Sequence, residues 1–145
     1  MNADFFPLLV LGHLTGDYLL QNKWMAMNKN GNWFTCVVHC CLYTAAVALF
    51  TAPVMSHFPL WIPVIFLTHF PIDYWGLADK WLDFINGRSL RDFFENGHRN
   101  IPPADSFAKE ENYQILRGGF TSVVYTMTDN TMHLILMYFA AKLFI

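Results

Sequence analysis

Charged residues are scarce in this sequence, and the scarcity is uneven. Asp, Glu, Lys and Arg make up 14% of the 145 residues, whereas 54% are hydrophobic and 17% are aromatic. A soluble domain usually contains about 25% charged residues, so the composition argues against an ordinary soluble domain. The charges that are present concentrate between Lys80 and Arg117. The apolar stretches on either side of this range are therefore expected to cross a membrane.

The sequence also shows no excess of basic residues, no disulfide pattern and no signal-peptide pattern. The formal net charge of -2 lacks the basic excess of nucleic-acid-binding proteins, so we expect no nucleic acid partner. The cysteines, Cys36, Cys40 and Cys41, are odd in number and crowd into one apolar segment, which argues against a disulfide framework and for reduced packing residues. The N-terminus lacks a positive signal-peptide region, and Asp17 would interrupt the hydrophobic one. The first apolar segment is therefore expected to be retained.

The apolar segments predict an all-α fold, a polytopic membrane protein with a bundle of four transmembrane helices in a single domain over residues 1–145. Pro63 and Pro71 are expected to bend the third helix. A long polar loop over about residues 78–117 is predicted between helices three and four, with an amphipathic turn and a short polar helix inside it. The predicted helices cover about residues 5–21, 33–52, 60–77 and 119–143.

Lysine and arginine predict the orientation of these helices. Connector one, residues 22–32, contains Lys23 and Lys29, and the long loop contains most of the remaining basic residues. The second connector, residues 54–59, contains none. The positive-inside rule therefore places connectors one and three in the cytoplasm and both termini on the outer side of the cytoplasmic membrane.

Each apolar segment carries a histidine, and three segments pair it with an aspartate at helical spacing. These residues are the pairs His13/Asp17, His69/Asp73 and Asp129/His133, together with His39 in the second segment. Residues four apart on a helix share one face, and imidazole and carboxylate groups are poorly solvated in hydrocarbon. In the predicted topology most of these groups fall in one slab in the cytoplasmic half of the membrane, and those of the fourth helix fit it least well. We therefore predict that they meet in a shared site.

The chemistry of these groups favours a metal centre. Seven nitrogen and oxygen donors exceed what one tetrahedral zinc ion takes, so we predict one or two divalent ions, with zinc ahead of manganese, iron or nickel. Asp17 or Asp129 would act as a base if it does not bind metal, and Gln21 would position a substrate oxygen. The sequence does not separate ligands from the residues that orient them. The candidate ligands are His13, Asp17, His39, His69, Asp73, Asp129 and His133.

Alternatives to a metal centre stay open at this point. His/Asp pairs can stabilise a helix bundle by internal hydrogen bonds, or they can form a proton relay. Cys36 and Cys40 share a helix face and are candidate soft ligands. His57 and His98 fall in connectors, where they are expected to be solvated.

The motifs also resemble a known family. The segment His13–Gln21, HLTGDYLLQ, looks like the N-terminal signature of domain-of-unknown-function family 3307, small multi-spanning proteins of bacteria and their phages. Asn130 stands where this family prefers Gln, and Tyr74–Gly76 stands where basic residues often follow the third-helix Asp. The other positions that match the family pattern are His39, His69, Asp73 and the segment Asp129–Leu134.

The resemblance leads to an expectation about function. The family is distantly similar to membrane-bound proteins labelled as metal-dependent hydrolases, which implies hydrolysis of a lipid-associated ester or phosphoester. Membrane lipids and a lipid-linked or phosphate-bearing substrate are then the expected partners, and an oligomer stays open. The alternatives are a protein that binds or transports metal or protons, and a structural membrane assembly module with a metal site.

Overall fold

The computed structural model describes residues 4–87 and 107–143, and it assigns no strand among them. The all-α prediction is confirmed. The chain separates into two compact units, which are described one at a time: residues 1–76 with 131–145, and residues 77–130. The elements in chain order are α1 (Phe5–Leu14), the π-helical turn η1 (Thr15–Leu19), α2 (Lys23–Asn28), α3 (Trp33–Thr51), the 3₁₀ turn η2 (Ala52–Val54), α4 (Phe58–Trp75), α5 (Leu77–Asn86) and α7 (Phe107–Ala141).

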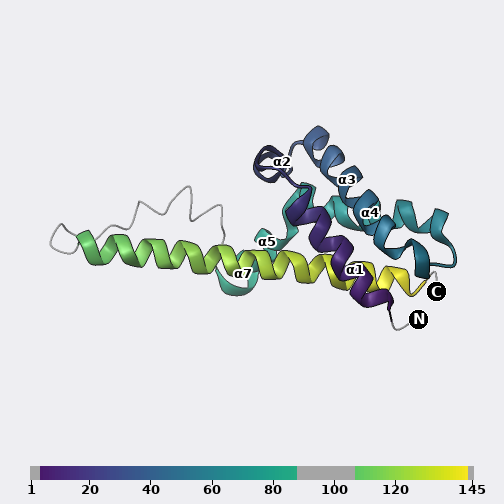
Figure 1. Cartoon of the computed structure of the whole chain (residues 1–145). Coiled ribbons are helices and arrows are strands. Elements are labelled where there is room, and N and C mark those ends of the chain that lie inside the picture. Colours follow the sequence, from purple (N-terminus) through teal and green to yellow (C-terminus); the bar gives the residue numbers. More distant parts are fainter. Residues whose placement is uncertain (1–3, 88–106, 144–145) are drawn as a thin grey trace. The chain divides into compact units, whose positions relative to one another are not determined.

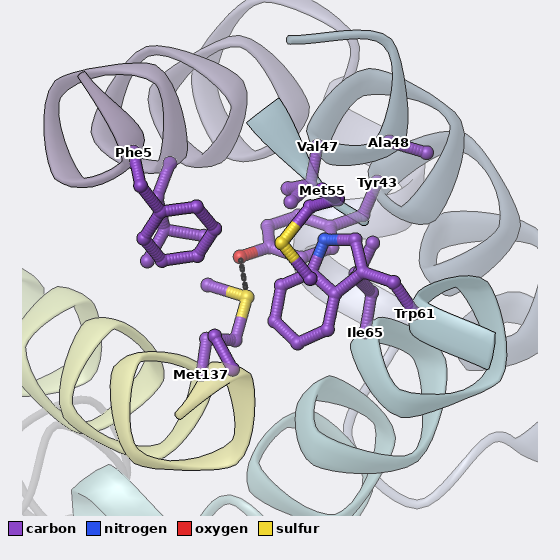
Figure 2. Close-up of a cluster of buried hydrophobic side chains, with 10 residues drawn as sticks. Phe5, Tyr43, Val47, Ala48, Met55, Trp61, Ile65 and Met137 are labelled. Atoms are coloured by element: carbon purple, nitrogen blue, oxygen red, sulfur yellow. Dashed lines mark hydrogen bonds between the residues drawn. The ribbon is translucent and has the colours of Figure 1, made fainter. Parts of the chain in front are cut away.

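Helix α3 is the centre of the first unit, where it packs against both α1 and α4 (Figure 1). It begins at Trp33 because the Asn32 side chain accepts a hydrogen bond from the Thr35 backbone N–H at 3.2 Å. Its inner face joins an apolar cluster with residues of α1, α4 and the end of α7 (Figure 2). In that cluster the Tyr43 hydroxyl donates to the Met137 sulfur at 3.3 Å.

Two glycines, Gly12 on α1 and Gly16 on η1, let this segment approach α3 closely. A Cβ atom added at Gly12 would lie 2.8 Å from the Cα atom of Val47, and one at Gly16 would lie 2.6 Å from Cδ2 of Tyr43. Atoms do not approach so closely, so larger residues at these positions would push the helices apart. Small residues four apart are a common way for membrane helices to pack backbone against backbone. The sequence Gly12-x-x-x-Gly16 thus fixes the distance between α1 and α3.

Helix α4 continues through both of its prolines and ends at Trp75, with Gly76 as its C-terminal cap. Gly76 has φ of 57°, a left-handed conformation that glycine adopts without steric cost. The prolines do not divide the helix, and the expected bend near His69 stays a prediction. The end of α4 is fixed by connector one, because the Gly31 N–H donates to the Tyr74 carbonyl oxygen at 3.0 Å.

The second unit corrects the predicted loop over residues 78–117. The segment predicted as an amphipathic turn is the helix α5. The short polar helix predicted over Phe107–Leu116 is helical but continuous with the fourth predicted helix, so α7 begins at Phe107 rather than near residue 119. The adjacent glycines at 118 and 119 do not end α7, because about 1 kcal/mol per glycine is a small cost within a helix of 35 residues. Residues 88–106 of the predicted loop, including His98, lie outside the described residues.

One helical segment in the described part of the chain, Trp33–Val54, is long and apolar enough to cross a membrane by length and composition. It has 22 residues and a mean hydropathy of 1.8. The arrangement with four spans therefore stays a prediction, as does the single domain over residues 1–145.

The close contact between α1 and α3 predicts opposite effects for two glycine substitutions. Gly12→Ala should lower the stability of the protein by about 1–3 kcal/mol, because the new methyl group meets the α3 backbone. Gly119→Ala on α7 is the matched control, since a Cβ there meets nothing within 4 Å, and it should be neutral or stabilising by up to about 1 kcal/mol. Thermal unfolding of both variants in detergent measures the difference. Equal midpoints would show that α1 and α3 tolerate separation.

Candidate metal centre

A group of buried polar side chains lies inside the first unit. Its histidines are at most 1% exposed, Asp73 is 4% exposed and Asp17 is 7% exposed. They come from four different elements, so the chain's fold brings together residues that are far apart in sequence. The cluster residues are Asp17 on η1, His39 on α3, His69 and Asp73 on α4, and His133 on α7.

The closest contacts of the cluster form a triangle. Nε2 of His39 and Nε2 of His69 lie 3.0 Å apart. Oδ2 of Asp73 lies 3.1 Å from the first nitrogen and 3.0 Å from the second. Two imidazoles and one carboxylate thus place three donor atoms at nearly equal distances from one another.

This triangle is a poor hydrogen-bonding arrangement on its own. Two Nε2 atoms 3.0 Å apart cannot both carry a proton, because the N–H groups of His39 and His69 would then face each other. The ammonium of Lys29 also lies 2.9 Å from Oδ2 of Asp73, so three nitrogen atoms approach one oxygen. Buried donors without acceptors cost about 1–3 kcal/mol each. A metal ion that accepts lone pairs from both rings would remove this conflict.

The donor set fits a divalent metal ion. Ligands bound to one ion at about 2.0–2.2 Å lie roughly 3–3.5 Å from one another, and the sides of the triangle fall at the short end of this range. Oδ1 of Asp17 extends the set, at 3.2 Å from Nε2 of His39 and 3.7 Å from Nε2 of His69. Imidazole and carboxylate without thiolate suit zinc, iron or manganese. The buried histidines and aspartates therefore could hold a metal ion, in the groups His39/His69/Asp73 and Asp17/His69/His133.

One part of the geometry does not follow the usual pattern of metal sites. The imidazole nitrogen that does not bind the metal usually donates to a neighbouring acceptor. Among the described residues, Nδ1 of His39 and Nδ1 of His69 have no hydrogen-bond partner. The Tyr43 ring orients the His69 ring instead by stacking on it, with ring centroids 3.6 Å apart and ring planes 16° apart.

His13 joins the cluster through its neighbours. Its Nδ1 atom lies 2.7 Å from the Tyr43 hydroxyl and 3.3 Å from Oδ2 of Asp17. This nitrogen therefore orients Asp17 in the described geometry, and the assignment of His13 as a metal ligand stays a prediction. The side chains of His13 and Asp17 are thus in contact as predicted from their spacing, although the π-helical turn η1 begins between them.

Comparison with known proteins gives a family. The profile described as "Protein of unknown function (DUF3307)" matches residues 5–145. The chain belongs to this family. No curated protein and no solved structure matches the chain. The family description assigns no activity, so the expected similarity to hydrolases stays a prediction.

In this member of family 3307, the first predicted helix ends earlier than expected, before Gln21. The helix predicted over about residues 5–21 includes Gln21, four residues after Asp17 and therefore on the same helix face. The π-helical turn η1 instead ends at Leu19, so Gln21 lies between η1 and α2. The wider π turn interrupts the spacing of four residues, and such turns often occur at functional sites. The Gln21 side-chain oxygen is buried without a hydrogen-bond partner among the described residues.

The last motif of the family is divided by the boundary between the units. His133 belongs to the first unit, where its Nε2 atom lies 3.7 Å from Oδ1 of Asp73. Asp129 lies one turn earlier on α7, within the second unit. Its assignment as a ligand or a base therefore stays a prediction.

The cysteines lie beside this cluster. Sγ of Cys36 is 3.8 Å from Sγ of Cys40, and both are buried, whereas Cys41 is exposed. Cys36 also donates to the Phe70 carbonyl oxygen at 3.9 Å. Neither thiol belongs to the groups that could hold a metal.

Sequence reasoning missed two residues of the site, Lys29 and Tyr43. Tyr43 follows His39 by four residues, and this helical spacing was the signal that could have found it. We assigned Lys29 to topology alone, because a lysine in a polar connector is usually solvated. Nothing in the local sequence shows that its ammonium reaches Asp73.

The contact between Tyr43 and His13 predicts a loss of stability on removing one oxygen atom. Tyr43→Phe keeps the stacked ring but leaves Nδ1 of His13 without its 2.7 Å partner, at a cost of about 1–2 kcal/mol. Tyr138→Phe is the control, because the half-buried Tyr138 ring contacts Phe6 edge-on and keeps this contact without its hydroxyl. The thermal midpoint in detergent should fall only for the first variant. A common midpoint would remove the hydroxyl from the account of the site.

Proposed function

We propose that this protein is a membrane-embedded, metal-dependent hydrolase of the bacterial inner membrane. The single observation that carries the proposal is the triangle of His39 Nε2, His69 Nε2 and Asp73 Oδ2, with sides of 3.0–3.1 Å. Asp17 and His133 supply further donors around it, and one divalent ion is enough for this set.

The proposed chemistry is hydrolysis of a lipid-associated ester or phosphoester. A divalent ion bound there would supply a Lewis acid that activates water and polarises the oxygen of an ester. Asp17 would accept a proton if it is not a ligand, since its carboxylate lies beside the triangle. Buried fixed charges act more strongly than charges in water, which suits charge stabilisation during hydrolysis.

Exposure within the cluster indicates where a substrate would enter. The histidine side chains are closed to solvent, whereas those of Asp17 and Lys29 are 7% and 11% exposed. Tyr43 stacks on His69 and also belongs to the apolar cluster with Trp61 and Met137 (Figure 2), so this cluster borders the site on the side of Tyr43. The entrance would therefore lie beside connector one. A path open from two sides would favour transport, and this apolar border argues against it.

The membrane arrangement is part of the same proposal. It has four spans, with connectors one and three in the cytoplasm, and it is supported by the apolar helix Trp33–Val54 and by the distribution of lysine and arginine. Connector one, which carries Lys29, then lies at the cytoplasmic surface. An ester next to a lipid headgroup would reach the site from this surface without leaving the membrane.

Metal analysis of the detergent-purified protein tests the site. Wild type prepared without chelators should contain about one divalent ion per chain, and His69→Ala should lose most of it because one of the three donor atoms of the triangle disappears. His57→Ala is the matched control, since His57 is exposed in the second connector. Wild type without stoichiometric metal would contradict the metal centre.

Hydrolysis needs a separate assay with detergent-dispersed carboxylic esters, phosphomonoesters and phosphodiesters. The metal-loaded protein should hydrolyse at least one class, and Asp17→Asn should lower turnover by about a hundredfold or more, as expected for a lost base or ligand. Asp83→Asn serves as the control, because Asp83 is exposed on α5. Bound metal without turnover on any class would favour the structural module, and unchanged turnover in Asp17→Asn would remove this residue from the mechanism.

A further inference from the structure

Lys29 is a buried cation at the edge of the cluster. Its side chain is 11% exposed, and its Nζ atom lies 2.9 Å from Oδ2 of Asp73. This is the same oxygen that forms the triangle with His39 and His69. Lysine is rarely buried unless it is paired, so the position of this ammonium requires an explanation beyond membrane topology.

Connector one is attached to the end of α4 in a way that directs Lys29 into the site. The Gly31 N–H donates to the Tyr74 carbonyl oxygen at 3.0 Å, and the Asn30 side chain packs where Gly76 has no side chain. The Lys29 N–H closes α2 by donating to the Met25 carbonyl oxygen at 2.9 Å. The backbone is thus held on both sides of Lys29, and its side chain is positioned rather than free to sample the surface.

The two buried carboxylates of the first unit explain why the Lys29 ammonium lies beside Asp73. Asp17 and Asp73 are two buried carboxylates, and a buried charge without a partner is strongly destabilising. Without a metal ion, the ammonium of Lys29 compensates one of them. With a divalent ion at the triangle, the ion and the ammonium would lie on the same oxygen and repel each other.

We propose that Lys29 is a resident cation that a divalent metal ion displaces from Asp73 when it binds. The inference rests on the proposed metal site and adds a regulatory residue to it. Lys29 stabilises the metal-free protein and lowers the affinity for metal, since the ion must replace an existing ion pair. The displaced ammonium then lies at the entrance of the site.

The first test compares metal affinities by competition with a chelator, using Zn²⁺ and Mn²⁺ separately. Lys29→Met should bind metal at least about tenfold more tightly than wild type, because it removes a positive charge beside the ion. Lys29→Arg keeps the charge and should stay within roughly threefold of wild type. Lys23→Met, in the same connector but exposed, should not change the affinity. Unchanged or weaker binding in Lys29→Met would overturn the proposal.

The second test uses the wild-type protein and therefore does not depend on how well a variant folds. Brief acetylation in detergent, quantified by mass spectrometry, should modify Lys29 several-fold faster after metal is added, while Lys23 serves as the internal reference. A rate for Lys29 that metal leaves unchanged, in protein shown to bind metal, would overturn displacement. Protein that binds no metal would instead contradict the proposed function, so the two failures are distinguishable.

Discussion

The compensation of one buried carboxylate, Asp73, is the constraint on which the rest of the site depends. Its Oδ2 atom lies 2.9–3.1 Å from nitrogen atoms of Lys29, His39 and His69. A carboxylate in an apolar bundle is stable only with such partners. The same oxygen is shared by the ammonium and by the triangle that would hold a metal. In the proposed metal site, stability without metal and affinity for metal would therefore be opposed at this single atom.

The packing of the first unit serves to keep these groups together. Gly12 and Gly16 allow α1 to contact α3, and this contact brings Asp17 to the side of His39. Tyr43 on α3 then connects α1 and α4, because its hydroxyl contacts His13 and its ring stacks on His69. Backbone proximity, rather than long side chains, thus sets the distances in the cluster. A bundle packed through larger residues would separate the donors.

Much of this arrangement could be predicted from the sequence. Helical spacing and apolar surroundings were sufficient to assign the helices around α3 and to group His39, His69 and Asp73. The π turn at η1 could not be predicted, because no local pattern in Thr15–Leu19 distinguishes it from a continued α-helix, and Gln21 was placed in the first helix as a result. Lys29 was missed because its contact with Asp73 joins a connector to a distant helix. Long-range contacts of this kind leave no periodic signal.

X-ray absorption spectroscopy of the metal-loaded protein tests the central claim most directly, because it identifies the atoms bound to the ion. The account predicts a first shell of nitrogen and oxygen at about 2.0–2.2 Å, with multiple scattering from at least two imidazole rings. A first shell of sulfur at about 2.3 Å would assign the ion to Cys36 and Cys40. That result, or a shell without imidazole, would contradict a metal centre built on His39, His69 and Asp73.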